Sequence, residues 1–202
     1  MASQISHVVY GRKIFSRYKD KNLSWPEFLV GTVFPDIRYV AKIDRKITHD
    51  FDVSEEIAPN SSSFKVGMYV HSYVDEKREG ILKKKSVYDL GLAKNWLFPT
   101  ALKLVEDEIM YSKYHNWNEA VDALDTYYNE EYEYVPNKRI VEKWHNLNKR
   151  LFEAKPDAEA WREMILKMGF EKDVPVEVME QIGLIRNNNK IISILSEIYK
   201  EI

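Results

Sequence analysis

Residues 67–76 read GMYVHSYVDE, a mostly apolar run that contains one histidine and, four residues later, one aspartate. Positions four apart lie on the same face of a helix, about one turn from each other. If residues of about 62–79 form a helix, most of its surface is apolar, and Lys65, Ser72 and Glu76 form only a narrow polar strip. We therefore expect His71 and Asp75 to point into the protein interior.

A buried carboxylate is strongly disfavoured unless a cation or several hydrogen-bond donors accompany it. Two explanations for Asp75 need no metal: it pairs with His71, or Arg78 satisfies it from one turn later. The third explanation is a metal site. The chain has no cysteine, so such a site must use histidine, aspartate or glutamate, a donor set that suits zinc, manganese or iron.

The composition is that of a soluble globular domain: 202 residues, 31% charged and 45% apolar. A net charge of −2 gives no general attraction to nucleic acid or to anionic lipid. The first residues lack the features of a signal peptide, and no run approaches the roughly 20 apolar residues of a transmembrane segment. We expect a cytoplasmic protein, and its oligomeric state is left open.

Apolar residues recur at helical spacing through most of the chain, which predicts an all-α fold and a single domain over residues 1–202. The second helix should begin at Ser24 and Pro26 and end at Phe34, because a residue before proline disfavours helical geometry. A long loop is expected over about 37–61. The other predicted helices cover about 5–18, 62–79, 99–113, 117–131, 137–154, 157–169 and 175–200, the last with a break at 186–189.

Further candidate ligands precede the 62–79 helix. His7 lies near the apolar side of the first helix, Asp36 follows a proline at a helix end, and His49 lies in the loop that follows. Each has an ordinary explanation, as a core histidine, a turn residue and an exposed loop residue respectively. Together with His71 and Asp75 they offer the histidine and carboxylate ligands that zinc binds.

Four stretches of the chain, SHVVYGRKIF (6–15), FLVGTVFPDI (28–37), ITHDF (47–51) and FKVGMYVHSYVDE (64–76), carry a family resemblance. In order and spacing they resemble motifs of the zinc-dependent phospholipase C and single-strand nuclease superfamily. The pattern is an early helix histidine, G-x-x-x-P-D, a loop histidine and G-x-x-x-H-x-x-x-D. The resemblance implies an all-α bundle of the phospholipase C or nuclease type, which cleaves phosphoester bonds at a cluster of up to three zinc ions.

Carried over by position, the resemblance implies that Asp36, His49, His71 and Asp75 hold one zinc ion. Asp75 would bridge to a second zinc ion shared with His7. Other divalent transition metals remain open. The expected enzyme hydrolyses a small phosphoester or a phospholipid through a metal-activated water.

The chain departs from the family pattern in three places. It begins Met-Ala-Ser, without the tryptophan whose amino group binds metal in secreted members, and Ile81 stands where a further ligand histidine is expected. The late H-x-x-x-D/E pair has one match, His115 and Glu119, farther along the chain than expected. The acidic stretch at 105–108 offers Asp107 as another ligand for the second metal, although a solvated helix face is the ordinary explanation for such a stretch.

At such a site Asp36 would act as the general base towards the attacking water. Arg38 and Arg78 would hold the substrate phosphate, because arginine suits phosphate geometry. Both are otherwise ordinary surface arginines.

Two alternative functions remain open from the sequence. In the first, His49 and Asp50 form the HD dipeptide of another all-α superfamily, whose members are phosphohydrolases acting largely on nucleotides. In the second, the chain is a non-catalytic helical interaction protein that keeps a vestigial or structural metal site.

Overall fold

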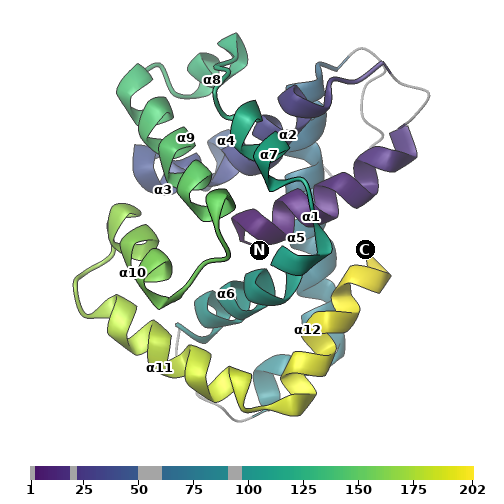
Figure 1. The fold of residues 1–202 in the computed structure, drawn as a ribbon, viewed down its shortest axis with the longest axis vertical. Coiled ribbons are helices and arrows are strands. Elements are labelled where there is room, and N and C mark those ends of the chain that lie inside the picture. Colours follow the sequence, from purple (N-terminus) through teal and green to yellow (C-terminus); the bar gives the residue numbers. More distant parts are fainter. Residues whose placement is uncertain (1–2, 19–21, 50–60, 91–96) are drawn as a thin grey trace.

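The structure is a computed structural model that describes residues 3–18, 22–49, 61–90 and 97–202 (Figure 1). All the regular elements in these ranges are helical, and they contain no strand. The predicted all-α architecture is therefore confirmed. None of the described helices has the length and apolar character that a membrane crossing requires.

The first part of the fold contains α1 (Gln4–Phe15), α2 (Trp25–Val33), α3 (Arg38–Ala41), α4 (Arg45–Thr48) and α5 (Ser63–Lys84). The second part contains α6 (Phe98–Met110), α7 (Trp117–Ala123), α8 (Asn129–Tyr134), α9 (Lys138–Glu153), α10 (Ala158–Lys167), α11 (Val174–Arg186) and α12 (Asn189–Glu201). Short 3₁₀ turns cover Ser16–Tyr18, Phe34–Ile37, Val87–Asp89 and Tyr111–Lys113.

Two of the predicted elements are wrong. The expected loop over 37–61 contains α3 and α4 in its described part, because Lys42 turns the chain with a positive φ of 55° and the Asp44 side chain caps α4 by accepting from the Lys46 N–H. The expected helix over 117–131 is two helices, α7 and α8, separated at residues 124–128. The predicted break near 186–189 is confirmed, since α11 ends at Arg186 and α12 begins at Asn189.

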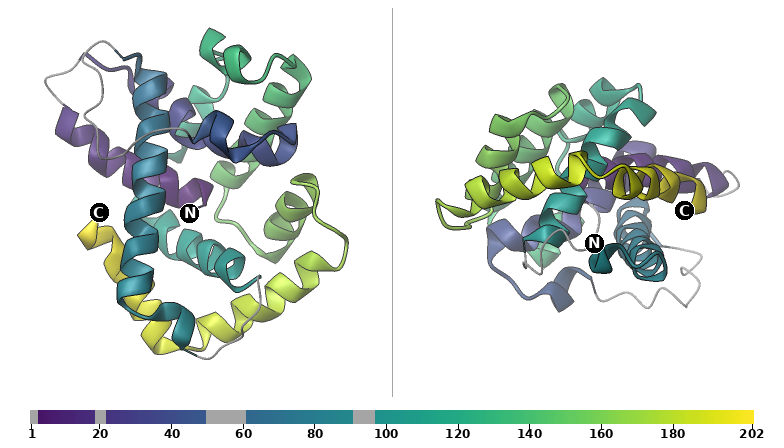
Figure 2. Two further views of the ribbon diagram at one scale, coloured as in Figure 1. Left: turned by 180° about the vertical axis from the view of Figure 1, so that it is seen from behind. Right: turned by 90° about the horizontal axis from the view of Figure 1, so that it is seen from below.

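Helix α5 runs along one side of the molecule over most of its length, and α1 crosses it near its middle (Figure 2). It continues five residues beyond the predicted end, to Lys84. His71 and Asp75 are buried on it, as the sequence predicts, and Arg78 is buried as well. Ser72, which was expected on the polar strip, is also buried, because α5 is covered on most of its circumference.

Helices α2 and α5 touch through their backbones at two glycines. A Cβ atom added at Gly67 would lie 2.2 Å from the Phe28 carbonyl oxygen, and one added at Gly31 would lie 2.1 Å from the Phe64 carbonyl oxygen. Both distances are far below van der Waals contact, so only glycine fits at either position. This close approach places the carbonyl groups of α2 within reach of side chains on α5.

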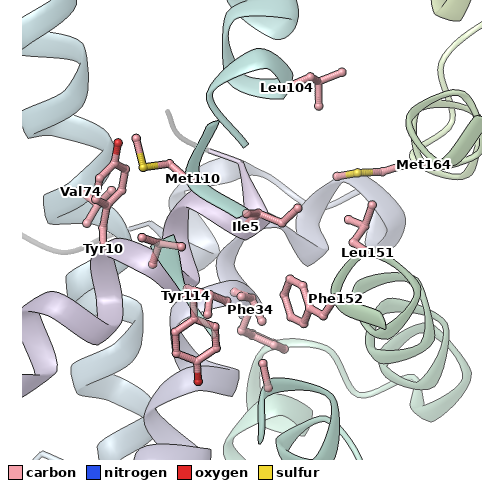
Figure 3. Close-up of a cluster of buried hydrophobic side chains, with 14 of the residues drawn as sticks. Ile5, Tyr10, Phe34, Val74, Leu104, Met110, Tyr114, Leu151, Phe152 and Met164 are labelled. Atoms are coloured by element: carbon pink, nitrogen blue, oxygen red, sulfur yellow. The ribbon is translucent and has the colours of Figure 1, made fainter. Parts of the chain in front are cut away.

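The buried core extends through most of the described helices, and Figure 3 shows the part of it to which α1, α6, α9 and α10 contribute. Ile5 of α1 and Leu104 of α6 lie in the same buried cluster as Phe152 of α9 and Met164 of α10. Burying a large apolar side chain stabilises a fold by about 1.5–3 kcal/mol. The cluster therefore holds the later helices firmly against the first helix and fixes their position relative to α5.

Candidate metal centre

All five predicted metal ligands meet in one place. His7 comes from α1, Asp36 from the 3₁₀ turn after α2, His49 from the C-terminal end of α4, and His71 and Asp75 from α5. Each of them is at most 8% exposed, so His49 is not the exposed loop residue of the ordinary explanation. The ligand atoms form two overlapping groups, His7–Asp36–His71 and His49–His71–Asp75, in which they lie within 4.8 Å of one another.

Hydrogen bonds to the outer ring nitrogens orient two of the histidines. His71 Nδ1 lies 2.9 Å from the Thr32 carbonyl oxygen, which only accepts, so Nδ1 carries the proton. His49 Nδ1 lies 3.0 Å from Thr48 Oγ1, and that hydroxyl donates its own proton to the Pro35 carbonyl oxygen at 2.8 Å. The Thr48 oxygen must therefore accept from His49. In both rings this leaves Nε2 with a lone pair, as in metal-binding histidines.

Three acceptor atoms then converge on one point, and an Asp36 oxygen lies beside them. The Nε2 atoms of His49 and His71 are 3.1 Å apart, and Asp75 Oδ2 lies 4.0 and 3.7 Å from them. Asp36 Oδ1 lies 3.9 Å from His49 Nε2 and makes no hydrogen bond with a described residue. Ligand atoms around a tetrahedral zinc ion are about 3.3 Å apart, given zinc–nitrogen bonds of about 2.0–2.1 Å. Asp75 Oδ2 also accepts from Arg45 at 3.4 Å, but the two imidazole lone pairs repel each other unless a cation lies between them, so the donor set fits a metal ion.

His7 extends this centre on the side of α1. Its ring is fully buried and stacks on His71, with the ring centroids 3.7 Å apart. Neither of its nitrogens makes a hydrogen bond with a described residue, and Nε2 lies 3.4 Å from Asp75 Oδ1. Buried polar groups are normally hydrogen-bonded, so the His7 ring, with Asp75 as its one polar neighbour among these contacts, is poorly satisfied. Asp75 thus presents Oδ2 to the two other histidines and Oδ1 to His7.

The protonation states also suit a metal. Burial and the neighbouring His71 ring lower the pKa of His49 to about 3, and burial and the neighbouring His7 ring lower the pKa of His71 to about 4. Burial would raise the pKa of Asp75, but His7 and His71 hold it well below its ordinary value. At neutral pH the two imidazoles are therefore neutral and Asp75 is ionised, which are the forms that bind metal ions.

A cleft of about 760 Å³ leads to the centre and is lined by His49 and Asp75 at its inner end. Its cationic residues are Arg45, Arg78, Lys83 and Lys103, and its aromatic residues are Tyr39, Tyr88 and Phe170. A smaller recess of about 50 Å³ adjoins it beside Asp36, with walls that include Leu104, Met164 and Ile165. Small molecules can therefore reach the centre from solvent.

The two predicted phosphate-binding arginines differ in their surroundings. Arg78 is 1% exposed and donates from Nε to Glu106, whose other carboxylate oxygen accepts from the Tyr10 hydroxyl. It is therefore not an ordinary surface arginine, although it borders the cleft. Arg38 stacks over the Tyr39 ring at 3.9 Å, with Nε 4.0 Å from Asp36 Oδ1. Arg38 is the arginine that lies closer to the predicted general base.

The acidic stretch at 105–108 is not a solvated helix face, because Glu106 and Asp107 are fully buried. Asp107 accepts from the backbone N–H groups of Ile5 at 3.3 Å and Ser6 at 2.8 Å, and from the Ser6 hydroxyl. It therefore caps the first turn of α1 from α6 and positions the helix just before His7. Burial raises the pKa of Asp107 to about 7, against the effect of these hydrogen bonds.

The other late candidates do not join the centre. His115 is exposed, and Glu119 accepts a hydrogen bond from the Tyr114 hydroxyl at 3.1 Å. Neither they nor Asp107 belong to the two groups of converging ligand atoms among the described residues. Asp50, on which the HD alternative depends, lies outside the described residues.

Asp107→Ala should lower the free energy of unfolding by about 3 kcal/mol, because buried donors left unsatisfied cost about 1–3 kcal/mol each. Chemical denaturation measures this loss. Glu108→Ala is the matched control on α6: its carboxylate pairs with Arg186, whose side chain is 52% exposed, so its loss should cost less than about 1 kcal/mol. Equal losses in the two variants would show that Asp107 does not hold α1.

Sequence reasoning missed the residues that support the ligands. Thr32 acts through its backbone carbonyl, which carries no sequence signal, whereas Thr48 stands beside His49 and its hydroxyl was a detectable clue. It also missed Lys103, which comes from α6 to line the cleft.

The fold and the site define an all-helical protein with a buried histidine–carboxylate centre at the inner end of a cleft. Comparison of the chain with protein-family models, curated proteins and solved structures finds no match.

Proposed function

We propose that this protein is a metal-dependent phosphoesterase, and that zinc is its metal. The observation that carries the proposal is the convergence of the His49 and His71 Nε2 lone pairs with two carboxylates. Structural metal sites are usually closed by protein ligands, whereas catalytic sites keep an open position. Here His49 and Asp75 border the cleft, which favours a catalytic site.

Asp36, His49, His71 and Asp75 would hold the first metal ion, and His7 with Asp75 Oδ1 would hold a second one. Histidine and carboxylate donors in this number suit zinc best, with manganese and iron as the alternatives. The second site has fewer protein ligands, so it should be weaker and should empty first under mild chelation.

Bound zinc supplies Lewis acidity and lowers the pKa of a coordinated water to about 7. The side chains of the protein supply the proton acceptor and the contacts to the substrate. The Asp36 carboxylate would accept the proton of the attacking water, and the Gln4 amide, which donates to its Oδ2 at 2.9 Å, fixes its orientation. The pKa of Asp36 would be raised by burial, but the neighbouring His71, Lys103 and His49 lower it, so the carboxylate is ionised and ready to accept. Arg38 lies beside it to hold an anionic substrate.

The substrate is a small phosphoester or the phosphate portion of a phospholipid. The cleft lies within the range of about 300–1,000 Å³ that is typical of small-molecule sites. Its lining combines cationic side chains, which attract phosphate, with aromatic walls that suit an apolar or ring-containing ester group.

The test is hydrolysis of a chromogenic phosphodiester by protein whose metal content is known from elemental analysis. Wild-type protein should hold at least one zinc ion per chain and should lose turnover on chelation. His7→Ala should keep about one metal per chain and lose about 100-fold in turnover, the scale of one lost transition-state stabiliser. His115→Ala, an exposed histidine, is the control that should change neither quantity.

Three outcomes would contradict parts of this proposal. Metal without turnover would indicate a structural metal site in an interaction protein. A His7→Ala variant with unchanged metal content and turnover would exclude the second metal. Loss of all metal in that variant would assign His7 to the primary site.

A further inference from the structure

Lys103 lies at the boundary between the cleft and the recess. It projects from the second turn of α6 and lines both cavities, together with Thr100 one turn before it. The recess brings Asp36 to the same boundary, and the cleft brings Asp75. Lys103 therefore faces the metal centre from the helix opposite to those that supply the ligands.

The other cations of the cleft have anionic partners. Arg45 lies 3.4 Å from Asp75 Oδ2, Arg78 pairs with Glu106, and Lys83 lies 3.5 Å from Glu79 Oε1. Lys103 makes neither a hydrogen bond nor an ion pair with any residue that the structure describes.

The charge of Lys103 is balanced at longer range by the ligand carboxylates. Burial lowers its pKa, and the charges of Asp36 and Asp75 act in the opposite direction. Once those two carboxylates bind metal, their negative charge is compensated by the metal ion. The ammonium group then faces a cationic centre across the cleft without a counterion. An anion placed between the two would satisfy both.

We propose that Lys103 is the residue that binds a phosphoryl oxygen of the substrate, with the Thr100 hydroxyl as a second donor. The inference rests on the proposed phosphoesterase function and adds the location of the phosphate. The phosphoryl group would lie at the boundary of the two cavities, in contact with α6, and not at the outer end of the cleft beside Lys83. Lysine suits this role because its ammonium group is a compact donor that phosphate accepts from.

The test is calorimetric titration of the zinc-loaded protein with inorganic phosphate, the smallest anion that the site would accept. Lys103→Met should weaken phosphate binding by about 10-fold to 100-fold, the effect of losing one charge-assisted hydrogen bond. Lys103→Arg, which keeps the charge, should recover part of the affinity. Lys83→Met is the matched control, because that side chain is 69% exposed and paired with Glu79, and it should bind like wild type. Elemental analysis and thermal unfolding establish that each variant is loaded and folded.

The inference is overturned if Lys103→Met binds phosphate as tightly as wild type, or if zinc-loaded wild type binds no phosphate. An equal loss of phosphate affinity in Lys103→Met and Lys83→Met would also overturn it, because the loss would then come from the lower net charge of the protein and not from a contact at Lys103. Failure of the proposed function looks different: wild type would lack phosphoesterase turnover while its phosphate affinity still depended on Lys103. Lys103 would then bind an anion at a site that does not hydrolyse phosphoesters.

Discussion

Gly67→Ala should destabilise the protein by about 3 kcal/mol, the upper end of the usual cost of overpacking. The added Cβ would lie 2.2 Å from the Phe28 carbonyl oxygen and 2.7 Å from the Thr32 backbone nitrogen. Both neighbours are backbone atoms of α2, so no side-chain rotation relieves the contact. The helices must separate, and the Thr32 carbonyl that orients His71 moves with α2. We therefore expect weaker metal binding as well as lower stability.

Gly80→Ala is the control for this substitution, in the same helix α5. A Cβ at Gly80 meets nothing within 4 Å, and alanine has a higher helix propensity than glycine. This variant should be more stable than wild type by about 0.5–1 kcal/mol, with unchanged metal content. Urea denaturation and elemental analysis measure both quantities. Similar stabilities of the two alanine variants would mean that α2 and α5 are not held together at Gly67.

The double variant His71→Ala with Asp75→Ala should lose metal binding completely. His71 belongs to both groups of converging ligand atoms, and Asp75 offers one oxygen to each side of the centre. Zinc that binds only the folded state stabilises it by about 2.7 kcal/mol when free zinc is 100-fold above the dissociation constant. Wild-type protein should show this gain in thermal unfolding with and without zinc, and the double variant should show none.

Asp50→Asn serves as the comparison for that experiment. The proposed ligand set does not include Asp50, so this variant should keep the metal and the zinc-dependent gain in stability. Loss of metal in Asp50→Asn would instead support the HD alternative. Zinc binding by the double variant at wild-type affinity would remove the basis of the proposed centre.

Much of this centre could be predicted because its residues follow local rules. The four-residue spacing of His71 and Asp75 places them on one face, and the narrow polar strip of that helix predicts that the face is buried. Asp36 could be selected as a candidate because it follows Pro35 at the end of a predicted helix. The all-α fold follows in the same way from the apolar spacing, which is repeated in most helices of the chain.

What could not be predicted depends on contacts between distant segments. Asp107 is buried because its carboxylate meets the start of α1, about a hundred residues earlier, and nothing in the acidic stretch itself indicates that partner. The place of Lys103 in the cleft likewise follows from how α6 packs against α1. The division between α7 and α8 was missed because the separating residues include no glycine or proline.

The two sides of the cleft come from different parts of the chain. All five proposed ligands lie between residues 7 and 75, whereas the opposite side carries Thr100, Lys103 and Phe170. Substitutions on that opposite side change the shape and charge met by an incoming molecule without touching a ligand. A library randomised only at such positions should therefore yield variants with new preferences at undiminished metal occupancy, which makes this arrangement a natural starting point for directed evolution.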